Sequence, residues 1–222
     1  MDVAATDFSA SRDVMVDGQL RPNKIVDPRL LEAARRLPRE RFLPPNLRAL
    51  AYIDADVPLG GGRVLVQPLI SARLIQLASP KAGEKALVIG AGTGYGAALL
   101  SACGAHVTAL EEDPALLAIA RSALAACAPT IRLVTGPLTA GYPSGAPWDI
   151  ILIEGAVAAV PPAIAEQVKL ETGRLVAVRE AAGRIGQAVL GERTAAGLAF
   201  RQAFDAATVY LPGFSPMPAF VF

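Results

Sequence analysis

From Lys85 onward, the hydrophobic positions fall into short unbroken runs separated by longer segments with helical periodicity. The run Ile150–Ile153 is apolar at every position, which is typical of a strand in a parallel sheet that is covered on both faces. This pattern predicts alternating strands and helices. The strands are predicted at residues 85–90, 106–111, 131–135, 148–153 and 174–179, and the helices at about 94–103, 114–126 and 161–169.

The last third of the chain follows a different pattern. Residues 186–193 and 200–211 form two strand-like runs with no helix between them, which predicts a hairpin and an antiparallel edge. The predicted fold class is therefore α/β, a doubly wound and mostly parallel sheet with antiparallel C-terminal strands and an N-terminal helical cap.

The first 80 residues have helical rather than strand periodicity. Asp27-Pro28 supplies an N-cap and an N1 proline for a helix with an apolar face, and shorter helices are predicted at 13–19 and 71–78. Residues 51–69, with three glycines at their centre, are predicted to be a long irregular loop of a functional kind. We interpret residues 1–80 as a helical cap with a substrate loop and 81–222 as a cofactor-binding core, together one compact unit.

Four glycines separate the first predicted strand of the core from the helix that follows it. Glycines at such a turn let backbone N–H groups approach a ligand closely. Glu111 ends the next strand, 21 positions after Gly90, where an acid suits the two hydroxyls of a ribose. The arrangement predicts an adenosine site. The spacing from Gly90 is usual for S-adenosylmethionine, whereas Gly92-Thr93-Gly94 with Ala97 also satisfies the nicotinamide-dinucleotide pattern, and a tight turn without a ligand is a third reading.

Composition narrows the possible partners. The 222 residues include 21 Lys or Arg and 20 Asp or Glu, and this near-neutral balance offers no electrostatic footprint for nucleic acid. No run approaches 18 apolar residues and the N-terminus is acidic, so we expect a cytoplasmic protein without a membrane partner. Cys103, Cys127 and the single histidine, His106, are too few to predict a disulfide framework, a metal site or a catalytic triad.

Five separated segments, in the same order along the chain, resemble the protein-L-isoaspartate O-methyltransferase family. They are Met15–Arg21, Pro38–Pro44, Val57–Gly60 with Gln67-Pro68 and Ala72-Arg73, Gly90–Tyr95, and Pro143–Asp149. The resemblance covers the chain from about Asp13 to its C-terminus. It implies an enzyme that transfers a methyl group from S-adenosylmethionine to the stray carboxylate of isoaspartyl residues in a protein or peptide, which initiates repair.

The resemblance also implies which positions serve the cofactor and the substrate. The expected cofactor-binding residues are Gly90, Ala91, Gly92, Thr93, Gly94, Tyr95, Glu111, Glu112, Gly136 and Pro137. The expected substrate-binding residues are Leu59, Val64, Leu65, Gln67 and Pro68, with Val66 at the position of the family's functional serine.

Three departures from the family pattern remove polar groups. Val66 offers no hydrogen bond to an acceptor, Val88 replaces an acid before the glycine loop, and Pro137 replaces an acid expected to serve the adenine. Each lost hydrogen bond is worth roughly 0.5–1.5 kcal/mol. The two losses on the cofactor side predict binding weakened by about tenfold to a few hundredfold. An alternative reading is therefore a cofactor-binding scaffold that has lost catalysis.

Glu154 follows the predicted strand 148–153, where the family commonly has a small or hydroxyl residue. Ligands of open α/β sheets lie beyond the carboxyl ends of the strands, so Glu154 is expected near the methyl acceptor. A charged Glu154 would repel a carboxylate by about 4 kcal/mol at 4 Å, but would assist an amine, hydroxyl or cationic acceptor. Arg73 is a conceivable partner for Glu154. The alternative is that Glu154 faces solvent or caps the next segment.

Overall fold

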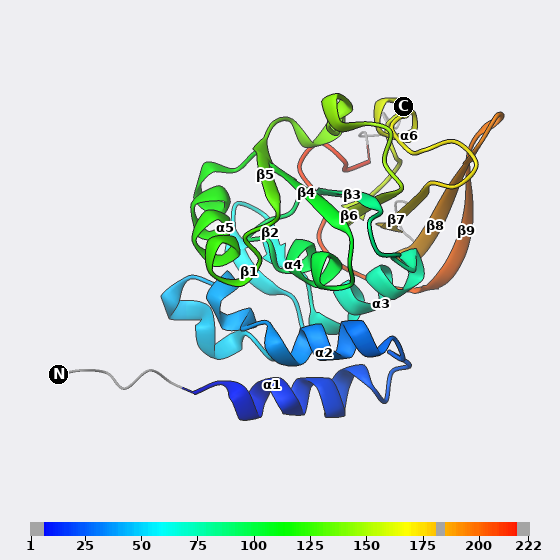
Figure 1. The fold of residues 1–222 in the computed structure, drawn as a ribbon. Coiled ribbons are helices and arrows are strands. Elements are labelled where there is room, and N and C mark those ends of the chain that lie inside the picture. Colours follow the sequence, from blue (N-terminus) through cyan, green and yellow to red (C-terminus); the bar gives the residue numbers. More distant parts are fainter. Residues whose placement is uncertain (1–6, 181–184, 217–222) are drawn as a thin grey trace, which may run out of the picture.

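The computed structural model describes residues 7–180 and 185–216, which build one central sheet with helices packed against it (Figure 1). The sheet has seven strands in the order β5-β4-β3-β6-β7-β8-β9. Five of them, from β5 to β7, run parallel, and β8 and β9 extend the sheet as an antiparallel hairpin. The predicted fold class is confirmed.

The strands lie close to the predicted ranges, except where noted below. Their bounds are β3 Lys85–Ile89, β4 His106–Glu111, β5 Arg132–Thr135, β6 Ile150–Val157, β7 Arg174–Arg179, β8 Gln187–Thr194 and β9 Gly197–Asp205. Alternate residues of a strand point to opposite faces of its sheet, and β3 divides accordingly between two apolar cores. Ala86 and Val88 belong to the core beneath the helices α3 (Pro68–Ala78) and α4 (Tyr95–Ala102), whereas Leu87 and Ile89 belong to the core on the opposite face.

Two helices begin directly after their predicted N-caps, Asp27 and Asp113, whereas the helix predicted at 71–78 begins earlier, at Pro68. The Asp27 side chain accepts a hydrogen bond from Arg29 N at 2.9 Å, and the Asp113 side chain caps α5 in the same way. The bounds of the helices are α1 Ser9–Met15, α2 Pro28–Arg36, α3 Pro68–Ala78, α4 Tyr95–Ala102, α5 Pro114–Cys127 and α6 Pro162–Ala165. The first helix continues as a π-helical turn, η1 Val16–Leu20, and is longer than predicted.

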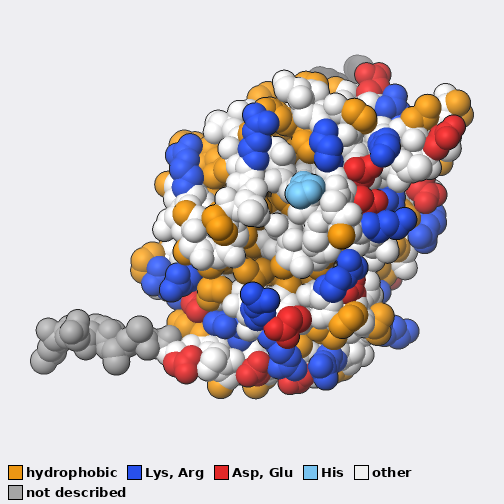
Figure 2. Space-filling view, in the orientation of Figure 1, with side chains coloured by type: hydrophobic (Ala, Val, Ile, Leu, Met, Phe, Trp, Pro, Cys, Tyr) orange, Lys and Arg blue, Asp and Glu red, His pale blue; other side chains and the backbone are white. Residues whose placement is uncertain are grey.

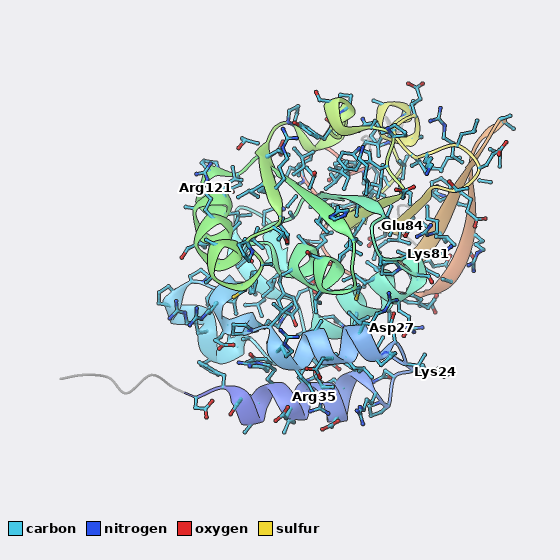
Figure 3. The ribbon with its side chains drawn as sticks, viewed as in Figure 1. Lys24, Asp27, Arg35, Lys81, Glu84 and Arg121 are labelled. Atoms are coloured by element: carbon cyan, nitrogen blue, oxygen red, sulfur yellow. The ribbon has the colours of Figure 1, made fainter. Side chains whose placement is uncertain are left out.

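Ion pairs hold the N-terminal cap together, and short 3₁₀ turns occur both in the cap and in the core. Arg35 of α2, labelled in Figure 3, donates to Asp13 of α1 at 2.8 Å and to Asp17 of η1 at 2.5 Å. The 3₁₀ turns are η2 Arg39–Phe42, η3 Pro45–Leu50, η4 Leu138–Ala140 and η5 Pro143–Gly145.

Two predicted segments have a different structure. The helix predicted at 161–169 ends at Ala165, because the backbone beyond it pairs with Trp148: Trp148 N donates to Gln167 O, and Lys169 N donates to Trp148 O, both at 2.8 Å. Residues 51–69 are not wholly irregular, since they include a small antiparallel hairpin of β1 Val57–Gly60 and β2 Arg63–Leu65.

The C-terminal segment also departs from prediction. The strand predicted at 200–211 ends at Asp205, and the chain then returns to the centre of the sheet beside β6. There Ala156 N donates to Val209 O at 2.8 Å, and Leu211 N donates to Ala156 O at 3.0 Å. The Leu211 side chain packs directly over Gly90, where an added Cβ would lie 2.7 Å from it. This approach explains why position 90 needs a glycine.

The strand predicted at 148–153 begins at Ile150 and continues to Val157, so Glu154 lies inside β6 rather than after it. The register of β6 against β7 shifts between Leu152 and Ala156. Irregularities of this kind re-aim a side chain within a strand. Glu154 therefore lies in the part of β6 where the regular pairing with β7 is interrupted.

Acidic and basic side chains are interspersed over the face of the molecule drawn in Figure 2. His106 is exposed at the start of β4, away from the carboxyl ends of the strands. Across the ranges 7–180 and 185–216, no helix has both the length and the apolar character that a membrane span requires.

Candidate active site

The glycine loop joins β3 to α4 at the carboxyl edge of the sheet. Gly90, Gly92 and Gly94 have φ angles of 70°, 56° and 96°, a region that favours glycine. A Cβ added at Gly92 would have only the carbonyl oxygen of Gly90 within 4 Å, so this part of the loop faces open space. The Oγ1 atom of neighbouring Thr93 is buried with no hydrogen-bond partner in the described part of the chain. The loop therefore combines backbone beside open space at Gly92 with a buried hydroxyl that has no partner.

Glu111, at the end of β4, is fully buried beside this loop. Its Oε2 accepts from Gly92 N at 2.7 Å, and its Oε1 accepts from Glu112 N at 2.9 Å and Asp113 N at 3.0 Å. These bonds join the end of β4 to the glycine loop. The two sequence features predicted to hold an adenosine are in direct contact.

Arg63 completes the surroundings of Glu111 and was not anticipated from the sequence. Its two terminal nitrogens donate to the two carboxylate oxygens at 2.7 and 2.8 Å, and one also donates to Gly90 O at 3.2 Å. Only 4% of the Arg63 side chain is exposed. The only available signal was an isolated arginine directly after three glycines in a segment predicted to be functional.

The remaining predicted cofactor residues lie around the same edge, but not all of them face a ligand. Glu112 accepts from Leu138 N at 3.2 Å, and Gly136 N donates to the backbone oxygen of Glu111 at 3.3 Å. Pro137 directly precedes the turn η4. These contacts bring the loop after β5 to the end of β4. The Tyr95 ring, by contrast, is buried against Phe42, with ring centres 5.3 Å apart.

The predicted substrate segment, Val64–Pro68, is held at its C-terminal end. Val66 is 5% exposed, and its carbonyl oxygen accepts from Arg39 Nη2 at 2.7 Å. Gln67 N donates to the Asp56 side chain at 2.7 Å. Leu59 and Val64 are partly buried against the core. The backbone at Val66 is therefore well fixed, although its side chain has no polar atom.

Arg39, in η2, is the second functional candidate that sequence reasoning missed. It is fully buried, donates through Nε to Ala51 O at 2.7 Å, and stacks on the Tyr95 ring at 4.5 Å. Burial lowers the pKa of the Arg39 guanidinium. Its Nη1 has no hydrogen-bond partner in the described ranges. A buried cation with an unused donor thus lies beside the substrate segment.

Glu154 is partly accessible in an otherwise buried strand. Its carboxyl group lies against the first turn of α4, where a Cβ added at Gly96 would be 1.8 Å from Oε1. Burial raises the pKa of Glu154 to about 8 and the charge of Glu111 adds to the rise, while the positive charges of Arg39 and Arg63 oppose it. The suggestion that Arg73 is the charged partner of Glu154 is wrong, because the Arg73 guanidinium stacks on the Phe204 ring, 3.6 Å from its centre.

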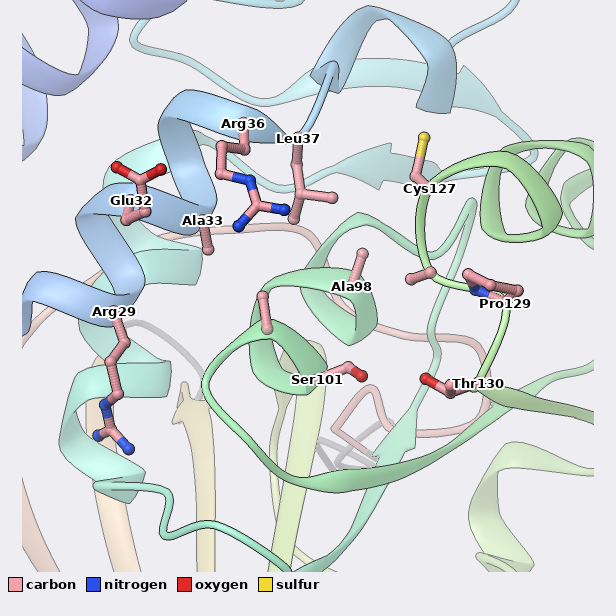
Figure 4. A pocket seen from close by; sticks show the side chains of 12 residues that line it. Arg29, Glu32, Ala33, Arg36, Leu37, Ala98, Ser101, Cys127, Pro129 and Thr130 are labelled. Carbon is pink, nitrogen blue, oxygen red and sulfur yellow. The ribbon is translucent and has the colours of Figure 1, made fainter.

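A separate cavity of about 490 Å³ lies between α2, α4 and the end of α5 (Figure 4). Arg36 approaches it from α2 and Leu37 from directly after that helix, Ser101 from α4, and Cys127 and Thr130 from the end of α5 and the loop after it. Because it borders the C-terminal half of α4, it lies away from the glycine loop, which precedes the N-terminus of the same helix. It is not part of the site described above.

The fold, the glycine loop and the acid at the end of β4 together define a Rossmann-like α/β protein with the elements of a nucleoside-binding site. The model of the protein-L-isoaspartate(D-aspartate) O-methyltransferase family matches residues 11–212. The chain belongs to this family, and the predicted resemblance is confirmed. A Methylorubrum populi protein-L-isoaspartate O-methyltransferase is 42% identical over 167 residues, covering 75% of this chain and 78% of the relative. One from Koribacter versatilis is 37% identical over 200 residues, covering 84% and 90%.

Solved structures agree with the fold. A protein-L-isoaspartate O-methyltransferase superposes with a TM-score of 0.78 at 24% identity, covering 91% of this chain and 66% of that one. A Plasmodium falciparum protein described as a protein-L-isoaspartate O-methyltransferase, solved in complex with S-adenosyl-L-homocysteine, gives a TM-score of 0.72 at 16% identity, covering 93% and 99%. At these identities the likeness concerns the fold.

Proposed function

We propose that this chain transfers the methyl group of S-adenosylmethionine to a carboxylate of a protein or peptide, with the isoaspartyl carboxylate as acceptor. The observation that carries the proposal is the contact between the glycine loop and Glu111, 2.7 Å from Gly92 N, at the carboxyl edge of the sheet. Membership of the protein-L-isoaspartate(D-aspartate) O-methyltransferase family favours this cofactor over a nicotinamide dinucleotide.

The residues present fit an adenosine-containing cofactor. The open backbone at Gly92 and the unpartnered Thr93 hydroxyl would hold it, together with the Glu111 carboxylate, which suits ribose hydroxyls. Val88 is fully buried and Pro137 has no N–H to donate, so neither replaces the polar groups expected there. When bound, S-adenosylmethionine supplies an activated methyl group. The polypeptide has to orient the acceptor toward it.

Orientation is the main catalytic task, because an ionised carboxylate is already a nucleophile and needs no general base. Arg39 would contribute by fixing the Val66 backbone and by offering its unused Nη1 beside the acceptor segment. A guanidinium N–H donated to a carboxylate is a strong, directional interaction. We propose that it partly replaces the hydroxyl that Val66 lacks.

Glu154 then acts as a neutral group rather than a repelling charge. A pKa of about 8 leaves its carboxyl mostly protonated at neutral pH. The protonated form carries an O–H donor and no charge, so it does not oppose a carboxylate acceptor. This removes the reason for expecting an amine, hydroxyl or cationic acceptor at neutral pH. Above pH 8 the repulsion foreseen from the sequence would return.

The test is methyl transfer from labelled S-adenosylmethionine to an isoaspartyl peptide between pH 6.5 and 9.5, with the ordinary aspartyl peptide as control. We expect base-labile methyl ester on the isoaspartyl peptide only, at a rate that falls as the pH rises through about 8. Glu154→Gln should remove this fall, because the variant cannot ionise. Cofactor binding without methylation of the isoaspartyl peptide at any pH would favour the scaffold reading instead.

The proposed substrate also defines the setting in which the protein acts. We infer a protein or peptide partner and a cytoplasmic location, without nucleic acid or membrane. The two cysteines are present as free thiols, Cys103 buried and Cys127 partly accessible, which is compatible with a reducing compartment. Burial raises the pKa of the Cys103 thiol to about 11, so it is unreactive at neutral pH.

A further inference from the structure

The Glu111 carboxylate has no free acceptor position. Its two oxygens accept five hydrogen bonds, three from backbone N–H groups and two from Arg63. An ionised carboxylate has about four lone-pair sites, so these donors saturate it. A ribose diol that donates to Glu111 must therefore displace at least one donor that is already present.

Arg63 is the donor that can leave. Two of the backbone donors, Glu112 N and Asp113 N, directly follow Glu111 in the chain, and the third, Gly92 N, belongs to the glycine loop itself. Within the described ranges, Arg63 is the only side chain that donates to Glu111. It reaches the carboxylate from a different part of the fold, the hairpin of β1 and β2.

The hairpin is built so that one end moves more easily than the other. Its turn, Gly60–Gly62, has three positive φ angles, and Cβ atoms added at Gly60 and Gly62 would meet nothing within 4 Å. The turn is therefore loosely packed. The other end is fixed, because Arg39 holds the Val66 carbonyl and Asp56 holds the Gln67 N–H, each at 2.7 Å.

We propose that Arg63 is a displaceable cap on the ribose site, and that the cofactor and Arg63 compete for Glu111. Cofactor binding swings the Gly60–Arg63 turn away while Val66 and Gln67 stay in place. The first residues of the substrate segment, Val64 and Leu65, lie between the moving and the fixed ends, so loading of the cofactor sets their position. The inference rests on the proposed function, because it takes Glu111 as the ribose ligand.

Competition predicts that weakening the cap tightens cofactor binding. Arg63→Gln should bind S-adenosylhomocysteine about tenfold more tightly in calorimetry, because two charge-assisted bonds no longer have to be broken. Arg63→Lys, which keeps the charge but loses the two-pronged geometry, should show a smaller gain. In a Glu111→Gln background, Arg63→Gln should bring no gain. Arg174→Gln is the matched control: it breaks the Arg174–Glu84 ion pair of 2.6 Å, far along the chain from Glu111, and should leave affinity unchanged.

Trypsin provides a second readout on the unmodified protein, because it cleaves after arginine. S-adenosylhomocysteine should accelerate cleavage of the Arg63–Val64 bond, with cleavage after Arg48 as the internal reference. Unchanged or weaker binding by folded Arg63→Gln, or protection of the Arg63–Val64 bond by the ligand, would overturn the cap while leaving the proposed function intact. Absence of S-adenosylhomocysteine binding in the wild type and in both Arg63 variants would overturn the proposed function as well.

Discussion

The proposed cofactor side of this site, around Glu111, and the proposed acceptor side, around Arg39 and Glu154, differ in how completely their polar groups are satisfied. On the cofactor side, Glu111 accepts five hydrogen bonds and has a bidentate partner in Arg63. On the acceptor side, Arg39 has a buried Nη1 without a partner, and the Glu154 carboxyl has only distant charges around it in the described part of the chain. A buried unsatisfied polar group costs about 1–3 kcal/mol.

The difference indicates that the two sides gain a ligand by different means. A ligand on the cofactor side has to replace interactions that the protein already makes, so binding there is linked to movement of the hairpin. On the proposed acceptor side, the Nη1 atom of Arg39 is left unpaired in the described part of the chain, so a ligand that reached it would add an interaction without replacing one. Three sets of substitutions test this comparison, in order of decreasing expected effect.

The largest effect is expected from Glu111→Ala, because it leaves Arg63 buried without its counter-ion. Removing one partner of a buried ion pair typically lowers the free energy of unfolding by about 3–5 kcal/mol. The affinity for S-adenosylhomocysteine should also fall, by roughly 1.5–3 kcal/mol for the lost ribose contacts. Urea unfolding and calorimetry measure the two losses. Glu84→Ala, which removes the ion-pair partner of the more exposed Arg174, is the control: it should lower the free energy of unfolding less and leave the affinity for S-adenosylhomocysteine unchanged. Equal losses of stability and affinity in the two variants would contradict the role proposed for Glu111.

The second effect concerns the pH dependence of stability on the acceptor side. Glu154 has a folded pKa of about 8, raised from its ordinary 4.5, so its stabilising contribution is complete below pH 4.5 and is lost as the pH rises to 8. Glu154→Gln should match the wild type at pH 4 and exceed its unfolding free energy by about 2–4 kcal/mol at pH 9, since one pKa unit corresponds to about 1.4 kcal/mol and the side chain is partly exposed. Parallel stability curves for the two proteins would show that Glu154 is not desolvated.

The smallest effect is expected from restoring the hydroxyl of the substrate segment. Val66→Ser should raise kcat/KM for an isoaspartyl peptide, because the added hydroxyl helps to orient the acceptor. Glu154→Thr should help mainly above pH 8, where the wild-type carboxyl is charged. If both residues touch one acceptor, the double variant should show a coupling of about 0.5–1 kcal/mol. Strict additivity at pH 9, or a folded serine variant that binds cofactor and gains nothing, would place Val66 and Glu154 outside a shared acceptor site.

The strand, the glycine loop and the acid of the proposed cofactor side could be predicted because they follow one another closely in the chain. The strand, glycine loop and helix from Lys85 to Ala102 follow one another in the chain, and the acid at Glu111 ends the next strand. The helix starts at Asp27 and Asp113 could be predicted for the same reason, because N-capping involves residues only two or three positions apart. The helix predicted at 161–169 failed because pairing of its second half with Trp148, a distant residue, prevailed over local periodicity.

The sequence by itself determined the order of strands and helices, the glycine loop, the acid that accompanies it, and the family. Only the tertiary structure decided that Arg63 forms an ion pair with Glu111 and that Arg39 donates a hydrogen bond to the Val66 carbonyl. It also decided that the Glu154 carboxyl packs against Gly96 and has a raised pKa. The physical reason is the separation along the chain: these contacts join residues that are 48, 27 and 58 positions apart in the sequence. Local sequence patterns show which side chains the chain contains near a site. Burial and pairing arise only once the chain has folded, and they decide whether a side chain is charged and whether it can contact a ligand.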